Sequence, residues 1–110
     1  MKSWLLLLLA VVCEVVGTSA IKYSNGFTKI VPSIVVFIGF GVAFYILSIT
    51  LKVIPIGMAY AVWSGLGIVL ISIIGHFVFQ QRLDAPAIVG MSFILVGVII
   101  MQIFSKAVAH

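Results

Sequence analysis

The chain has 110 residues, of which 65% are hydrophobic and 7% are charged, and its formal net charge is +4. Soluble domains typically carry about 25% charged residues, so this composition excludes a water-soluble globule and indicates an integral membrane protein. The basic residues stand singly between apolar segments and form no cluster, which argues against a nucleic-acid-binding protein.

The first apolar segment, residues 4–21, contains one charged residue, Glu14, near its middle. About 20 such residues span a bilayer as a helix, and a charge at the centre costs about 2.5 to 3.5 kcal/mol on insertion scales. Each leucine at positions 5–9 favours insertion by about 0.3 to 0.6 kcal/mol, so the helix can insert although it carries an acid. Because Val12 does not suit a cleavage site and three further apolar segments follow, we expect a permanent span and not a signal peptide.

Small residues share the helix face of Glu14. Positions three, four and seven residues away lie on that face, and Ala10, Gly17 and Thr18 among them are small. We expect space there for a ligand or a partner helix, and a binding role for Glu14, because intramembrane acids are rare and usually functional. The alternative is a structural carboxylate that bonds Thr18 or a neighbouring helix and holds the bundle in register.

A second span, residues 30–51, follows a polar loop, residues 22–29, that carries a Ser-Asn-Gly turn signal. Phe40 and Phe44 belong to an aromatic stripe at helical spacing in this span. Such stripes are more often packing or lipid contacts than binding walls. Nearby small residues would let another backbone come close; they are Gly39, Gly41 and Ala43.

The third span, residues 56–79, places Tyr60, Trp63 and Ser64 on one helix face. Trp63 lies well inside the span, although tryptophan usually belongs at the membrane interface. It either packs against a neighbour or offers a π-face to a cation, a contact worth about 2 kcal/mol when desolvated. Combined with Glu14, Trp63 and Tyr60 would make a site for a hydrophobic cation.

Glycines recur in the third and fourth spans. Gly65 and Gly67 indicate either a helix kink or a close helix crossing. In the fourth span, residues 85–104, small or regular positions recur with heptad spacing, which predicts a helix-to-helix contact face. These positions are Ala87, Gly90, Ile94, Gly97 and Met101.

The basic residues do not specify a direction of insertion. Four spans place three lysines and arginines on each side of the membrane, so the usual excess on the cytoplasmic side is missing. These are Lys2, Lys52 and Lys106 on one side and Lys22, Lys29 and Arg82 on the other. We therefore expect chains to insert both ways and to pair as an antiparallel homodimer, which would generate the inverted repeats of larger transporters.

Four stretches carry motifs: EVVGT from Glu14, KYSNGFT from Lys22, PIGMAYAVWSGLG from Pro55 and QRLD from Gln81. Together they resemble the small multidrug resistance family of bacterial proton-coupled exporters. The resemblance covers essentially the whole chain, and the third stretch is specific.

By this resemblance, Glu14 is the carboxylate that protons and substrate share, and Tyr60 and Trp63 contact the substrate. Gly65 and Gly67 would permit a kink in the third span. Gly90 and Gly97 would lie in the dimer contact. The residues expected to line the chamber are Ala10, Gly17, Thr18, Phe40, Phe44 and Ser64.

Two branches of the family differ near the acid. The guanidinium-exporting branch typically has a tryptophan shortly after the acid and a serine near the position of Ala43. This chain has Gly17-Thr18 and Ala43 instead, which resembles the multidrug, quaternary-cation branch. It departs from many multidrug members at Phe40, where they carry a tyrosine, and this loss of a hydroxyl bears on hydrogen bonding around Glu14.

We predict a single four-helix membrane domain, residues 1–110, in the bacterial inner membrane, working as a proton-coupled antiporter that exports quaternary ammonium and aromatic cations. Loss of water disfavours a charged carboxylate, so protons and cations would compete for Glu14. The alternatives are a guanidinium exporter of the same family and a non-transporting membrane subunit with a structural acid.

The sequence shows no arrangement typical of an enzyme site. It has no metal-ligand cluster, phosphate-binding loop or Ser/His/Asp set, and its single cysteine permits no disulfide within the chain. We therefore expect no cofactor other than the proton gradient and no bound metal. His76, near the end of the third span, receives no predicted role.

Overall fold

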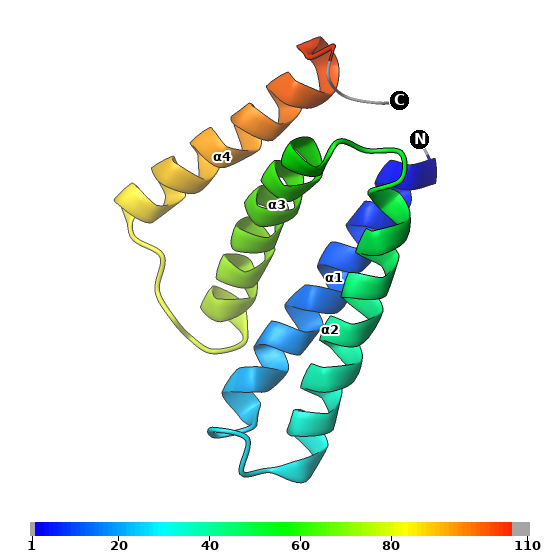
Figure 1. Cartoon of the computed structure of the whole chain (residues 1–110). Helices are drawn as coiled ribbons and strands as arrows, with labels where there is room; N and C mark the ends of the chain where they lie inside the picture. Colours follow the sequence, from blue (N-terminus) through cyan, green and yellow to red (C-terminus); the bar gives the residue numbers. More distant parts are fainter. Residues whose placement is uncertain (1, 107–110) are drawn as a thin grey trace. The chain divides into compact units, whose positions relative to one another are not determined.

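The computed structural model describes residues 2–106, and these form four α-helices with no strand among them. Each helix is long and apolar enough to cross a membrane, which confirms the predicted all-α, four-helix membrane fold. The helices are α1 (Lys2–Tyr23), α2 (Ile30–Thr50), α3 (Ile56–Phe77) and α4 (Ala85–Phe104) (Figure 1). Their ends lie within two residues of the predicted spans. Met1 and residues 107–110 of the predicted domain lie outside the described residues.

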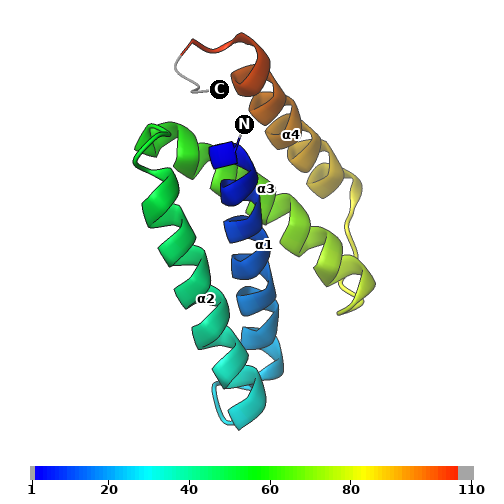
Figure 2. The same ribbon diagram turned by 90° about the vertical axis from the view of Figure 1, so that its right-hand side faces the viewer.

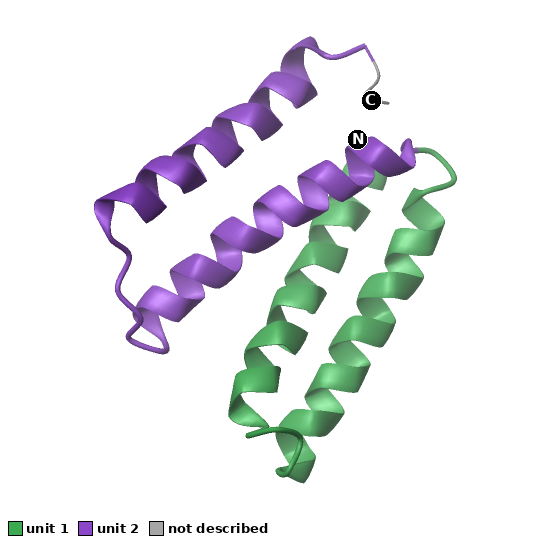
Figure 3. Cartoon of the chain, turned by 60° about the vertical axis from the view of Figure 1, so that its left-hand side comes forward, with its two compact units in different colours: residues 1–53 green, residues 54–110 purple. Residues whose placement is uncertain are grey.

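The chain divides into two compact units, Met1–Val53 and Ile54–His110 (Figure 3). In the first unit, α1 and α2 lie side by side as an antiparallel hairpin (Figures 1 and 2). In the second unit, α3 and α4 form the other helical pair. The organisation of both units as one domain stays a prediction.

Glycine brings the backbones of α1 and α2 together. A Cβ atom added to Gly39 would lie 3.0 Å from the carbonyl oxygen of Cys13 and 3.1 Å from Cα of Gly17. Both neighbours are backbone atoms, which cannot turn aside as a side chain can. The hairpin therefore requires glycine at position 39, as the small residues of the second span predicted.

The loop between α1 and α2 is organised around Ser24, which is completely buried. Its hydroxyl group donates a hydrogen bond to the carbonyl oxygen of Ile21 at 2.6 Å and accepts one from the backbone N–H of Phe27 at 3.0 Å. Asn25, Gly26 and Phe27 follow in left-handed conformations with φ of 48°, 70° and 65°. A bulky residue such as phenylalanine rarely adopts this conformation, so the serine bonds hold an otherwise unfavourable turn.

Helix α3 ends at Phe77, two residues before the end of the predicted span. Gln80 adopts a left-handed conformation with φ of 54°, and the backbone N–H of Gln81 donates to the carbonyl oxygen of Gly75 at 2.9 Å. The chain thus turns back on the helix end. Apolar composition continues through Phe79, which explains why the prediction placed the end of the span too late.

Helix α4 is capped at its start and little covered along its length. The Asp84 carboxylate accepts a hydrogen bond from the backbone N–H of Ala87 at 3.0 Å, which is the usual N-cap arrangement. No residue of α4 is buried. Its closest approach to a glycine of α3 is at Gly65, where an added Cβ would lie 3.0 Å from a methyl group of Ile94 and of Val98.

Candidate functional site

Glu14 lies midway along α1 and is partly buried. The hydroxyl group of Thr18, one turn further on, donates a hydrogen bond to its Oε1 at 2.9 Å. The hydrogen bond between Thr18 and Glu14 that the structural alternative predicted is therefore present. A hydroxyl group carries no charge, so this bond cannot balance the charge of an ionised carboxylate.

Among the described residues of the first unit, 2–53, no lysine or arginine lies beside Glu14 along α1. Lys2 and Lys22 stand at the two ends of α1, about 18 Å and 12 Å from Glu14 along the helix at 1.5 Å per residue. Lys29 is the N-cap of α2, and Lys52 follows that helix. Within the described part of this unit, the carboxyl group of Glu14 therefore has no basic partner. An ionised carboxylate inside a membrane span is costly without one.

Phe40 and Phe44 line the α2 side of the face that carries Glu14. A Cβ added to Gly17 would lie 2.9 Å from the ring atom Cδ2 of Phe40, so this ring rests directly on α1 one turn beyond the acid. The Phe40 and Phe44 rings pack at 5.8 Å between centroids with an angle of 46°. Phe44 remains 55% exposed, so part of this aromatic pair is open to a ligand, a lipid or another helix.

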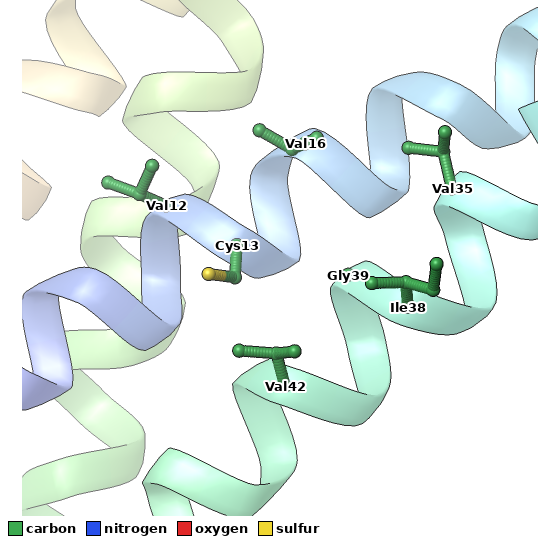
Figure 4. A pocket seen from close by; sticks show the side chains of 7 residues that line it. All are labelled: Val12, Cys13, Val16, Val35, Ile38, Gly39 and Val42. Atoms are coloured by element: carbon green, nitrogen blue, oxygen red, sulfur yellow. The ribbon is translucent and has the colours of Figure 1, made fainter.

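The opposite face of the hairpin carries an apolar groove of about 240 Å³ (Figure 4). Val12 and Val16 lie two residues before and after Glu14, about 200° around the helix from it. The groove is therefore separate from the face that carries the acid, and nothing in the sequence patterns predicted it. Its lining consists of Val12, Cys13 and Val16 from α1 and Val35, Ile38, Gly39 and Val42 from α2.

The predicted aromatic residues of the second unit lie on α3. Tyr60 is 70% exposed, whereas Trp63 and Ser64 are partly buried. Helical spacing places all three on one face of α3, so a flat apolar ligand could contact them together. That this face meets Glu14 stays a prediction, because the residues belong to different units.

Gly65 and Gly67 lie in a continuous part of α3, which is α-helical through both positions. For Gly65, the contact with Ile94 and Val98 supports the close-crossing alternative within the second unit. Both glycines are buried. The kink at these residues stays a prediction.

Gly90 and Gly97, the glycines of the predicted dimer contact, are exposed on α4. A Cβ added to either would meet no atom of the described residues within 4 Å. Ile94, between them in the heptad pattern, instead contacts Gly65 of the same chain. The predicted contact face therefore divides into a part that packs on α3 and a part that is uncovered, and its role in a dimer stays a prediction.

His76 is the titratable residue of α3 for which the sequence predicted no role. Its Nδ1 atom is buried without a hydrogen-bond partner among the described residues, and its ring meets Phe77 edge-on at 4.8 Å. Across residues 2–106, no group of three His, Cys, Asp or Glu side chains could hold a metal ion.

Comparison with known proteins places this geometry in context. The family model described as Small Multidrug Resistance protein matches residues 2–94. The chain is 56% identical to the quaternary ammonium compound-resistance protein QacE of Escherichia coli, over the full length of both. It is 48% identical to the multidrug transporter EmrE of Escherichia coli K12, over 92% of each chain.

A third relative is a putative ethidium bromide resistance protein of Salmonella typhimurium, which is 58% identical over 86% of this chain and 83% of its own. The name of EmrE describes a multidrug transporter and not an enzyme, in agreement with the composition and with the four apolar helices of this chain. The chain therefore belongs to the Small Multidrug Resistance family and is a multi-pass protein of the bacterial inner membrane.

Proposed function

We propose that the chain is a proton-coupled exporter of lipophilic cations, in which Glu14 binds protons and the cation in turn. The observation that carries this proposal is the isolated carboxylate of Glu14 midway along α1, with a single hydroxyl contact from Thr18 and the basic residues of its unit at the helix ends. When it is ionised, a carboxylate in such a place is stabilised by a proton or a cation that comes from outside its own unit.

The surroundings of Glu14 favour an apolar cation over an inorganic one. The aromatic pair Phe40 and Phe44 lies on the same side of the hairpin, and Trp63 with Tyr60 would add flat surfaces on α3. Aromatic faces attract cations more strongly when water is excluded. The names of the relatives, which refer to quaternary ammonium compounds and to ethidium, support the same class of substrate.

Exchange of protons for the lipophilic cation follows if both compete for the Glu14 carboxylate. A protonated Glu14 is neutral and offers a cation no charge attraction, whereas a bound cation favours the ionised form. Linkage requires that cation binding release protons to the same extent that protons weaken cation binding. If the protein changes the side on which it is open only when Glu14 is occupied, an inward proton gradient drives the cation out.

The working unit would be an antiparallel homodimer. Gly90 and Gly97 give α4 an uncovered face where another backbone can approach closely. The even distribution of lysine and arginine allows both directions of insertion. Two such chains would supply two Glu14 carboxylates to one chamber.

The proposal is tested by proton release from detergent-solubilised protein in weak buffer on addition of tetraphenylphosphonium. We expect the unsubstituted chain to release protons, and the cation affinity to fall as the pH is lowered. Glu14→Gln should abolish the release and most of the binding. Asp84→Asn is the matched control, because Asp84 is the only other acid in the sequence and caps α4 outside the candidate site.

Binding by Glu14→Gln that retained the pH dependence would contradict the proposal. Transport into liposomes made with this polypeptide alone separates the two alternatives. A non-transporting subunit would move nothing without its partner protein, whereas a guanidinium exporter would move guanidinium in preference to tetraphenylphosphonium.

A further inference from the structure

The contact between Gly17 and Phe40 lies one helical turn from Glu14. A Cβ added to Gly17 would lie 2.9 Å from Cδ2 and 3.1 Å from Cε2 of the Phe40 ring. Side-chain carbons do not approach each other so closely, so the ring fills the space that any side chain at position 17 would need. Gly17 therefore determines where this ring can rest.

The position of the ring affects its neighbours on both sides. Towards α2, the Phe40 ring packs on Phe44 at 5.8 Å between centroids. Towards α1, Gly17 is followed directly by Thr18, whose hydroxyl group bonds Glu14 at 2.9 Å. The aromatic pair and the carboxylate are thus connected through two adjacent residues of α1.

One direction is closed to the Phe40 ring. On its inner side the backbones of α1 and α2 are in contact, because a Cβ on Gly39 would lie 3.1 Å from Cα of Gly17. A side chain at position 17 would therefore turn the Phe40 ring outward, towards the exposed Phe44 and the face that carries Glu14.

We propose that Gly17 is a specificity-determining residue that keeps the Phe40 ring against α1 and so leaves the space beside Glu14 wide enough for bulky, flat aromatic cations. This inference rests on the proposed function. A methyl group at position 17 narrows that space without changing its charge. Large aromatic cations lose affinity, whereas compact aliphatic ammonium ions keep it.

The test compares the dissociation constants of the full chain for tetraphenylphosphonium and tetramethylammonium. Gly17→Ala should raise the ratio of the first constant to the second by about tenfold. In a Phe40→Leu background the same substitution should change the ratio less than about twofold, because leucine lacks the ring atoms that collide. Such non-additivity is what two residues in contact show.

Two other glycines of α2 serve as matched controls. Gly41→Ala should leave the ratio unchanged, because an added Cβ there meets nothing within 4 Å. Gly39→Ala disturbs the backbone contact between the helices. It should weaken the binding of both cations to the same extent and so leave the ratio unchanged, which is the result expected of a purely structural change.

Two results would overturn the inference while leaving the proposed function intact. One is an equal loss of both cations in Gly17→Ala, and the other is an undiminished effect of Gly17→Ala in the Phe40→Leu background. If the unsubstituted chain bound neither cation, the proposed function itself would fail, and this inference with it.

Discussion

The two units of the chain hold their helix pairs together in different ways. In the first unit, the helices meet backbone to backbone, where Gly39 of α2 lies against Cys13 and Gly17 of α1. In the second unit, the contact at Gly65 of α3 is with the side-chain methyl groups of α4. Helix α4 has no buried residue, whereas α1 has six.

This difference shows which helix faces are packed against another helix of the same chain and which are not. Between helices in lipid there is no hydrophobic driving force, so close packing of small residues holds them together. The α1–α2 hairpin uses such packing within one chain, and this fixes the position of α2 beside the helix that carries Glu14. The exposed glycines of α4 offer the same kind of packing, but no atom of another helix among residues 2–106 lies within 4 Å of a Cβ added to them.

The largest expected effect comes from adding a methyl group at the backbone contact of the hairpin. Gly39→Ala must push the helices apart and should lower the free energy of unfolding in detergent by about 3 kcal/mol, at the upper end of the overpacking range. Gly65→Ala should cost about 1 kcal/mol, because the methyl groups of Ile94 and Val98 can shift slightly. Denaturation of both variants in mixed micelles measures the two values. Equal losses would remove the distinction between the units.

The next effect concerns the loop that joins α1 to α2. Ser24→Ala removes two hydrogen bonds and leaves the N–H of Phe27 without its acceptor, so it should cost about 2 kcal/mol. Ser48→Ala is the control, because its hydroxyl group makes an exposed bond to the carbonyl oxygen of Tyr45. A cost for Ser24→Ala no larger than that for Ser48→Ala would mean that the loop does not stabilise the first unit.

The smallest effect on a single chain should come from α4. Gly97→Ala adds a methyl group that meets nothing within 4 Å, so the unfolding free energy of a monomer should change by less than about 1 kcal/mol. The dimer proposed above should nevertheless dissociate more readily, which fluorescence energy transfer between labelled chains can measure. Gly57→Ala, equally open but at the start of α3, should leave association unchanged. Unchanged association in Gly97→Ala would exclude this face as the dimer contact.

Much of the fold could be predicted because it depends on composition and spacing alone. The lengths of the apolar segments predicted the positions of all four helices. The small residues of the second span predicted that another backbone comes close, as the α1 backbone does at Gly39. The end of α3 could not be located in this way, because it depends on the left-handed Gln80 and on the bond from Gln81. Neither feature changes the apolar character of the segment.

The candidate site was predictable only in part. Helical periodicity placed Thr18 beside Glu14, and the structure contains the bond between them. The contact of Phe40 with Gly17 was not predicted, because it joins residues of two helices whose relative rotation the sequence does not state. The apolar groove beside Cys13 was missed for the same reason. The meeting of Glu14 with Trp63 and Tyr60 stays a prediction for the binding experiments.

The hydrogen bond between Thr18 and Glu14 has a consequence for any transport cycle. Donor and acceptor are carried by successive turns of the same helix, so a rigid movement of α1 carries both together. The bond then contributes the same energy on either side of the membrane and cancels from the difference between the inward-facing and outward-facing states. In the exchange proposed above, a difference in the affinity of Glu14 between the two states would therefore come from groups that do not move with α1.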